Sequence, residues 1–192
     1  MDIYFIRHTK PAIAAGTCYG QADIPLADSF VAEYAGLRQK IQHLRTARVY
    51  SSPLQRCLQL AECVAQSANF GSVQIDARLK ELNFGDWEMQ AWQDIPLSAI
   101  EEWASDYVAH APPNGESFAT LHLRARQFLM ELCIDADAPP ALIFTHAGVI
   151  RAVIAEIQQS PLSHAFDFKI DYAGITKVMV TPDAIKLTEI NV

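Results

Sequence analysis

Short apolar runs alternate with longer amphipathic stretches along this 192-residue chain. Four runs have the length and composition of strands, at residues 2–7, 48–50, 73–76 and 141–145. Apolar residues recur at helical spacing in four stretches between and after them, at 28–44, 54–67, 116–133 and 148–157. Strands that alternate with helices favour a three-layer α/β/α fold, in which helices cover both faces of a mostly parallel central sheet.

Local signals refine the ends of these elements. Asp28 or Ser29 is the expected N-cap of the first helix. Ser52-Pro53 is expected to start the second helix, because proline is favoured at the first helical position. The C-terminal tail predicts antiparallel edge strands at residues 166–169, 175–180 and 185–189.

Residues 77–116 break the regular pattern. They contain all three tryptophans and several prolines and show no long period. We therefore expect a single domain, 1–192, with a lid insertion at about 85–116 that lies over the edge of the sheet and contains a helix near 97–108. Trp87, Trp92 and Trp103 are expected to pack within the lid rather than to stack on a substrate.

Composition and charge narrow the function. Hydrophobic residues make up 51% and charged residues 19% of the chain, as in a globular protein. The net charge of -7 argues against a nucleic-acid partner, which usually requires a basic face. No apolar run approaches the roughly 18 residues of a membrane span, and we expect no signal peptide and no membrane partner. The exposed strand edges of the tail would allow a homodimer.

The cysteines indicate the compartment. The four cysteines form no C-x-x-C pair, so a zinc site or a redox motif is not expected. Without an export signal they are expected to be reduced thiols, which predicts a cytoplasmic protein. Their positions are Cys18, Cys57, Cys63 and Cys133.

Three strand exits carry the candidate chemistry. The first strand ends in Arg7-His8-Thr9, the second leads into Ser51-Ser52-Pro53-Leu54-Gln55-Arg56, and the strand at 141–145 ends in Thr145-His146-Ala147-Gly148. The exits of parallel strands lie at one edge of the sheet, where open α/β sheets bind their ligands. Two histidines and two arginines at that edge predict a pocket for a phosphate with a nucleophile inside it.

Each of these residues is suited to a role in phosphoryl transfer. Arg7 and Arg56 present planar guanidinium groups that can hold phosphate oxygens bidentately. His8 is the candidate nucleophile, and its second ring nitrogen should donate to a backbone carbonyl that fixes the tautomer. His146 can donate to the phosphate oxygens, and the helix that opens at Ala147 offers free N–H groups to an anion.

A carboxyl group is needed to protonate the leaving oxygen. Glu81 is the candidate, with Asp86 and Glu88 as rivals. Gln21, in the loop after the nucleophile, is a candidate contact to phosphate or substrate. Considered alone, Glu81 and Arg56 are each also compatible with a solvated surface charge. The remaining histidines are expected to be structural or surface residues, at His43, His110, His122 and His164.

This ordered set of motifs resembles the histidine phosphatase superfamily, also called phosphoglycerate mutase-like, over nearly the whole chain. The resemblance includes the segment Glu81-Leu82-Asn83-Phe84-Gly85-Asp86-Trp87-Glu88. It implies catalytic roles for Arg7, His8, Arg56, Glu81 and His146, and neither a metal nor an organic cofactor. The chain departs from the usual pattern where Thr9 and Met89 stand in place of glycine.

The expected function is therefore hydrolysis of a small phosphate monoester through a phosphohistidine on His8. Mutases of the family usually carry longer insertions, so this compact chain favours a phosphatase. Broad-specificity phosphatases and enzymes for sugar phosphates or phosphoglycerates stay open as alternatives. So do a non-catalytic phospho-ligand binder on the same fold, a protein phosphatase with a wide lid, and a metallophosphatase.

Overall fold

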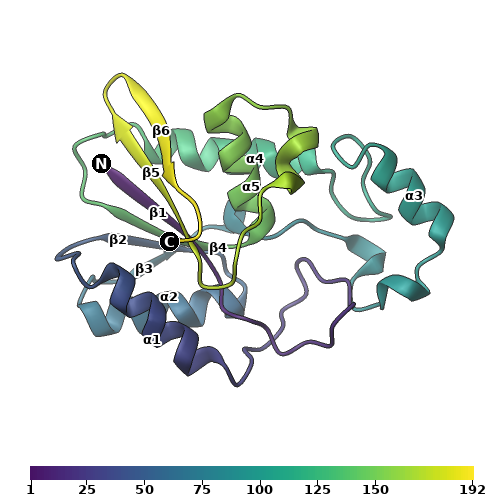
Figure 1. The fold of residues 1–192 in the computed structure, drawn as a ribbon, viewed down its shortest axis with the longest axis horizontal. Coiled ribbons are helices and arrows are strands. Elements are labelled where there is room, and N and C mark those ends of the chain that lie inside the picture. Colours follow the sequence, from purple (N-terminus) through teal and green to yellow (C-terminus); the bar gives the residue numbers. More distant parts are fainter.

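The computed structural model describes residues 1–192 and contains one six-stranded sheet (Figure 1). The strand order is β3-β2-β4-β1-β5-β6, and the first four strands in this order are parallel. β5 and β6 run antiparallel at one edge. The strands are β1 (Asp2–Arg7), β2 (Arg48–Ser51), β3 (Val73–Ile75), β4 (Ala141–Thr145), β5 (Ile175–Thr181) and β6 (Ala184–Glu189). The predicted, mostly parallel α/β sheet is confirmed.

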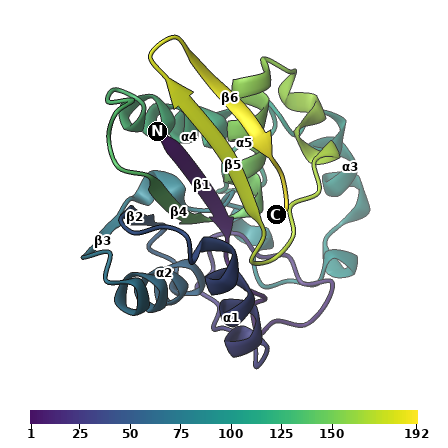
Figure 2. The ribbon, with the colours of Figure 1, turned by 60° about the vertical axis from the view of Figure 1, so that its left-hand side comes forward.

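Helices cover both faces of this sheet, as Figures 1 and 2 show. α1 (Phe30–Ile41) and α2 (Gln55–Ala68) lie on one face, and α4 (Phe118–Leu132) and α5 (Ala147–Gln158) lie on the other. α3 (Leu97–Ser105) lies away from the sheet. None of these helices has the length and apolarity that a membrane crossing requires.

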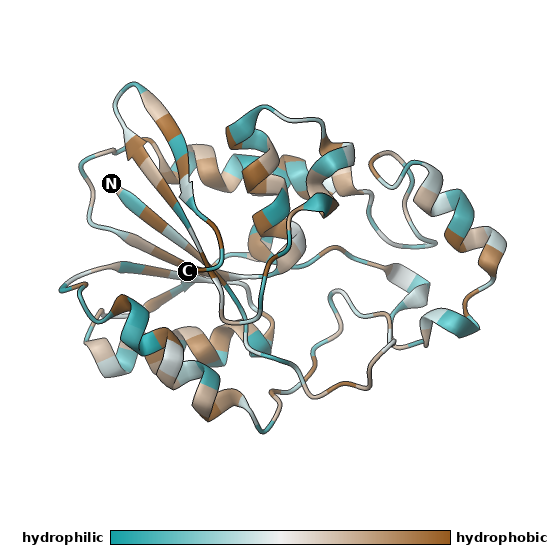
Figure 3. Ribbon diagram, in the orientation of Figure 1, coloured by the Kyte–Doolittle hydropathy of each residue, from teal (hydrophilic) through white to brown (hydrophobic).

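Alternate residues of the central strands build two cores. Ile3 and Phe5 pack with α4 and α5, whereas Tyr4 and Ile6 pack with α1 and α2. All five residues of β4 are buried, as expected for a strand covered on both faces. Bands of apolar residues on the strands and helices are visible in Figure 3. Each fully buried Ile or Phe contributes about 1.5–3 kcal/mol, so these layers hold the strand exits in place.

The predicted helix ends need small corrections. Ser29 occupies the N-cap position of α1, but its hydroxyl donates to the Glu33 carboxylate at 2.5 Å instead of accepting a backbone N–H. Pro53 lies before α2 rather than at its first position, and Leu54 is the N-cap. The Ser52 hydroxyl accepts from the Leu54 N–H at 3.3 Å, so this turn begins with a side-chain bond.

The strand predicted at 166–169 is wrong. Leu162–Asp167 forms a 3₁₀ helix after Pro161, although Phe166 and Phe168 alternate with polar residues as in a strand. Phe166 packs edge-on against Tyr107, with 4.8 Å between ring centroids, and against Phe118 at 5.5 Å. These contacts place Phe166 by tertiary packing rather than by strand pairing. The other two tail strands are present as β5 and β6.

The 85–116 segment is held together by its tryptophans. Trp87 lies 6.2 Å from Trp92 and 5.9 Å from Trp103 between ring centroids. Cys18 and Ile95 complete this small apolar cluster. The predicted packing role of the tryptophans is therefore confirmed, and the helix of the segment is α3, which ends three residues earlier than predicted.

Candidate active site

The three strand exits meet at one edge of the sheet, as the sequence predicts. β1 and β4 are parallel neighbours with Arg7 opposite Thr145, so the next residues, His8 and His146, lie side by side. Their ring centroids are 5.1 Å apart. β2 lies on the other side of β4 and brings Ser52 and the start of α2 to the same place.

His8 is buried and held in one tautomer. Its Nδ1 lies 2.7 Å from the Thr9 carbonyl oxygen, which can only accept, so Nδ1 carries the proton. Nε2 is therefore left with its lone pair, as predicted for a nucleophile. Burial, together with the nearby charges of Arg56 and Arg7, lowers the pKa of His8 well below its ordinary value, so the neutral imidazole dominates near neutral pH.

Two arginines flank His8 with donors to spare. Arg56 is fully buried and donates to the carbonyl oxygens of Ala22 at 2.8 Å and Gly20 at 2.5 Å. Arg7 donates to the Ile170 carbonyl at 2.6 Å. The Nε atoms of both arginines are buried without an acceptor in the protein. Buried donors normally find a partner, so this pair is suited to an anion.

His146 is fully buried beside these groups. Its Nε2 shares a 2.9 Å hydrogen bond with the Ser52 hydroxyl, and the Cys57 thiol lies 3.4 Å away. Burial, Arg56 and His8 lower the pKa of His146 well below its ordinary value. These effects favour the neutral imidazole of His146, and a bound phosphate dianion would favour its protonation. The N–H of Ala147, the first residue of α5, precedes the helical ladder and can meet an anion.

Glu81 lies at the other side of the site. Its carboxylate accepts the Gly148 N–H at 3.1 Å and the Leu82 N–H at 2.9 Å. The Gly148 N–H at the start of α5 is thus used by Glu81, which differs from the expectation that this amide is free for phosphate. Glu81 lines a cavity of about 180 Å³ together with Arg7.

The two other candidates for the acid, Glu88 and Asp86, bind groups elsewhere. Glu88 accepts backbone N–H groups from Gln21 at 2.8 Å, Ala22 at 2.5 Å and Phe84 at 3.0 Å, and so ties two loops together. Asp86 is exposed and accepts the side-chain amide of Asn114 at 2.9 Å. Neither lines the cavity that Glu81 shares with Arg7.

Gln21 is directed toward Glu81 rather than into the cavity. Its side-chain amide donates to the Glu81 carbonyl oxygen at 3.0 Å, and it does not line the cavity. The structure thus engages this residue within the protein, and its contact with a substrate stays a prediction.

The sequence assigned no catalytic or binding role to three polar residues that contact this site. Tyr172 stacks on the Arg7 guanidinium at 3.7 Å, Ser52 bonds to His146, and Arg151 lines the cavity. Arg151 stands four residues after Ala147, so helical spacing could have placed it on the same side of α5. Tyr172 lies in a loop before β5 and carries no comparable signal in the sequence.

The remaining histidines lie outside this site, as predicted. His122 pairs with Glu156 at 2.8 Å and His164 with Asp167 at 3.2 Å. His43 contacts the Tyr4 hydroxyl, and His110 contacts the Glu102 carbonyl oxygen. Nowhere in the chain do three His, Cys, Asp or Glu side chains gather as metal ligands do.

Fold and site together define an α/β phosphoryl-transfer enzyme of the histidine type. The chain belongs to the histidine phosphatase superfamily (branch 1), whose sequence pattern matches residues 3–192, and it is a phosphatase of that family.

Relatives with known names support this assignment. The chain is 29% identical over 175 residues to the adenosylcobalamin/alpha-ribazole phosphatase of Salmonella typhimurium, covering 89% of this chain and 86% of that protein. It is 25% identical to a glucosyl-3-phosphoglycerate phosphatase of Mycobacterium tuberculosis, covering 84% and 77%. The crystal structure of the alpha-ribazole phosphatase from Shigella flexneri superposes with a TM-score of 0.91 at 26% identity, covering 100% of this chain and 96% of that one.

Proposed function

We propose that this phosphatase hydrolyses a small phosphate monoester in two steps through a phosphohistidine on His8. The observation that carries the proposal is the lone pair on His8 Nε2, which the Nδ1 bond to Thr9 leaves free beside two arginines with unpaired donors.

In the first step, the Nε2 lone pair attacks phosphorus and an N–P bond forms. The P–O bond to the leaving group breaks, and its electron pair stays on the leaving oxygen. Glu81 gives its proton to that oxygen, so an alcohol departs and Glu81 becomes a carboxylate. Arg7, Arg56, His146 and the Ala147 N–H hold the three other phosphate oxygens as charge shifts in the transition state.

In the second step, the Glu81 carboxylate takes a proton from water while the water oxygen attacks phosphorus. The N–P bond breaks and its electron pair returns to Nε2 of His8. Inorganic phosphate then leaves, with Glu81 protonated again and His8 neutral. The lowered pKa of His8 fits this cycle because the imidazole must start and end without a proton on Nε2.

For the substrate, we propose α-ribazole 5′-phosphate, whose dephosphorylation is a step of cobalamin synthesis. Two segments, Cys18–Leu26 and Pro113–Ser117, resemble α-ribazole phosphatases, and relatives with that name match in sequence and in structure. The cavity beside Glu81 is lined by four aromatic side chains, which suits a leaving group that carries an aromatic base. They are Tyr19, Phe84, Phe118 and Phe166. The 85–116 segment would act as the lid that sets this choice.

A second candidate substrate class is a phosphate ester that also carries a carboxylate. Arg151 lines the same cavity and adds a cation on the leaving-group side. Burial of its guanidinium lowers the pKa of Arg151 below its ordinary value. A carboxylate would pair with it, as in a phosphoglycerate type of ester.

A substrate panel tests this proposal. We expect kcat/KM for α-ribazole 5′-phosphate to exceed that for phosphoglycerates, sugar phosphates and phosphopeptides by at least about 10²-fold, since a matched pocket discriminates by several kcal/mol. Equal, low values across the panel would remove the ribazole assignment but leave the chemistry. A preference for phosphoglycerates would select the second class, and a preference for phosphopeptides would indicate a protein phosphatase.

Two further properties are part of the proposal. All four cysteines are free thiols, which supports a cytoplasmic protein.

The outer edges of the sheet, β3 and β6, carry unpaired backbone groups through which a homodimer would form. The net charge of -7 disfavours binding of nucleic acid. Sedimentation at micromolar concentration would test the dimer. We expect a chelator to leave turnover undiminished. Loss of turnover in the chelator would indicate a metallophosphatase.

A further inference from the structure

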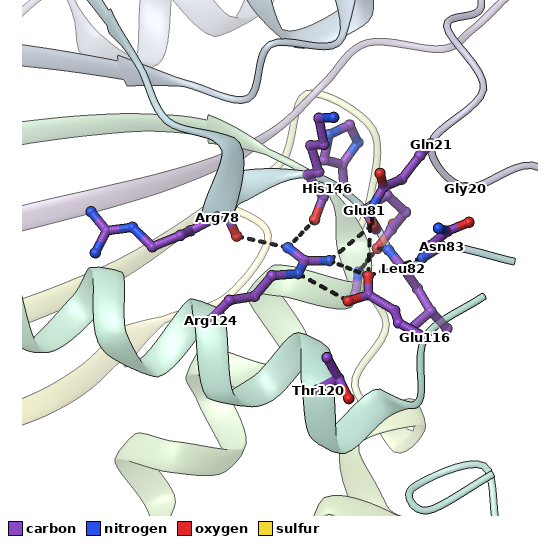
Figure 4. Close-up of polar contacts among 12 residues, drawn as sticks. Gly20, Gln21, Arg78, Glu81, Leu82, Asn83, Glu116, Thr120, Arg124 and His146 are labelled. Carbon is purple, nitrogen blue, oxygen red and sulfur yellow. Dashed lines mark hydrogen bonds and ion pairs between the residues drawn. The ribbon is translucent and has the colours of Figure 1, made fainter. Parts of the chain in front are cut away.

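Arg124 makes the densest set of side-chain hydrogen bonds near the site without facing the cavity (Figure 4). It projects from α4 toward the segment that carries Glu81. Its guanidinium donates to the carbonyl oxygens of Arg78 at 2.7 Å, Lys80 at 2.5 Å and Glu81 at 3.0 Å. It also donates twice to the Glu116 carboxylate, at 2.5 Å and 3.2 Å. These bonds use all five donors of the guanidinium.

The contacted segment runs from a short 3₁₀ helix (Ala77–Leu79) into residues without regular structure. Residues 80–84 are in neither a helix nor a strand, so their backbone groups need partners from outside. One planar guanidinium supplies partners for three carbonyl oxygens within four residues. The position of the Glu81 backbone is therefore set by α4, an element that belongs to the main core.

Glu116 extends this support to the neighbouring loop. Besides binding Arg124, its carboxylate accepts the Asn83 N–H at 3.0 Å. Gln21 donates to the Glu81 carbonyl oxygen at 3.0 Å, so that oxygen is held from two sides. The side chains of Arg124 and Glu116 are only 17% and 14% exposed, which shields their ion pair from water.

We propose that Arg124, paired with Glu116, is a positioning residue for the carboxyl group of Glu81. This inference rests on the proposed role of Glu81 as the acid of the first step. The Glu81 backbone is fixed by α4 while its carboxylate reaches the Gly148 N–H of α5, so both ends of the residue are held. A displacement of about 1 Å can lower a rate by about 10²-fold, so such support matters for catalysis.

Arg124→Lys tests the proposal because it keeps the charge but loses the planar set of five donors. Arg126→Lys is the matched control, since Arg126 lies on the same helix but pairs with Glu156 on the surface. The two readouts are kcat/KM for an alkyl phosphate and for p-nitrophenyl phosphate. The alkyl ester is α-ribazole 5′-phosphate, or the best alkyl phosphate of the panel if that substrate fails.

An alkoxide needs a proton to leave, whereas p-nitrophenolate leaves without one. We therefore expect Arg124→Lys to lower kcat/KM for the alkyl ester by about 10–10²-fold. The value for p-nitrophenyl phosphate should change by less than about 3-fold, and Arg126→Lys should change neither. Inhibition by inorganic phosphate should stay as in the wild type, because the groups that hold phosphate are untouched.

Equal losses for both substrates would overturn the proposal, because a purely structural defect does not depend on the leaving group. No loss for either would overturn it as well. Glu81→Gln separates this outcome from failure of the mechanism: if that variant also loses equally on both substrates, Glu81 is not the acid. Should Arg124→Lys fail to fold, Glu116→Gln weakens the same support and is subject to the same two criteria.

Discussion

The two sides of the candidate active site are built in different ways. On the phosphate side, His8 and His146 follow directly from neighbouring parallel strands, and Arg56 lies in the first turn of a helix. All three are essentially fully buried. On the leaving-group side, Glu81 stands in a segment without regular structure, which side chains from α4 and a distant loop hold in place.

This difference separates chemistry from choice of substrate. The phosphate side is fixed by the sheet itself, because His8 and His146 directly follow β1 and β4 and Arg56 lies in the first turn of the helix after β2. The leaving-group side depends on a few buried polar bonds, among them those of Arg124 and Gln21 to the Glu81 carbonyl oxygen. We expect the first side to tolerate little variation and the second to respond to each contact separately.

The largest effect should come from His8→Ala. Without the Nε2 lone pair no phosphohistidine can form, so kcat should fall by at least about 10⁴-fold. The loss should be the same for alkyl and aryl phosphates, in contrast to variants on the Glu81 side. Calorimetric binding of inorganic phosphate should persist, since both arginines remain. Unchanged turnover would refute the role of His8.

Gly148→Ala should act on the leaving-group side of the site. An alanine Cβ at this position would lie 2.2 Å from Glu81 Oε1, so the carboxylate must move. We expect about a 10²-fold fall in kcat/KM for an alkyl phosphate and a smaller one for p-nitrophenyl phosphate. Gly36→Ala in α1 is the control, because its Cβ meets nothing within 4 Å. An equal fall for both esters would mean that the phosphate site was disturbed instead.

Stability should depend on pH through the two buried histidines. The folded state lowers the pKa of His8 and His146, so their contribution is fully present above the unfolded value of about 6.5. As pH falls below that value, the two histidines bind protons in the unfolded chain but not in the folded one. We expect the free energy of unfolding to fall by up to about 1.4 kcal/mol per histidine for each pH unit. Urea unfolding of wild type and His146→Gln should show the shallower pH dependence in the variant.

The smallest effect should come from Met89→Gly. Met89 has φ +69°, the left-handed region in which the family pattern usually has glycine. Relief of this strain is worth about 1–2 kcal/mol, and the added freedom of glycine in the unfolded chain costs about 0.5–1 kcal/mol. The net gain in unfolding free energy should be about 0.5 kcal/mol. Activity should not change, and destabilisation would show that the Met89 side chain has a packing role.

The fold and the phosphate side follow from the sequence because their signals are local. An apolar run that ends in Arg7-His8 predicts both a buried strand and the place of its exit. The parallel order then brings His146 beside His8, and a proton on Nδ1 follows from the neighbouring carbonyl. Each of these steps needs only a short stretch of chain.

The leaving-group side could not be predicted in the same way. Arg124 stands on the polar face of an amphipathic helix, where a charged residue ordinarily faces water, and only the fold brings it to the carbonyls of residues 78–81. Glu88 and Glu81 stand in the same stretch of sequence, yet one binds three backbone amides and the other reaches the cavity. Phe166 shows the same limit, since distant aromatic rings override its strand-like pattern.

Trapping the phosphoenzyme tests the central claim most directly. Wild-type protein mixed rapidly with substrate and quenched in base should carry one phosphoryl group, labile to acid as an N–P bond is, on the peptide that contains His8. The same experiment on Glu81→Gln with p-nitrophenyl phosphate should accumulate more phosphoenzyme, because without the Glu81 carboxylate water attacks the phosphohistidine slowly. A phosphoryl group on another residue, or full turnover with none on any peptide, would contradict the account.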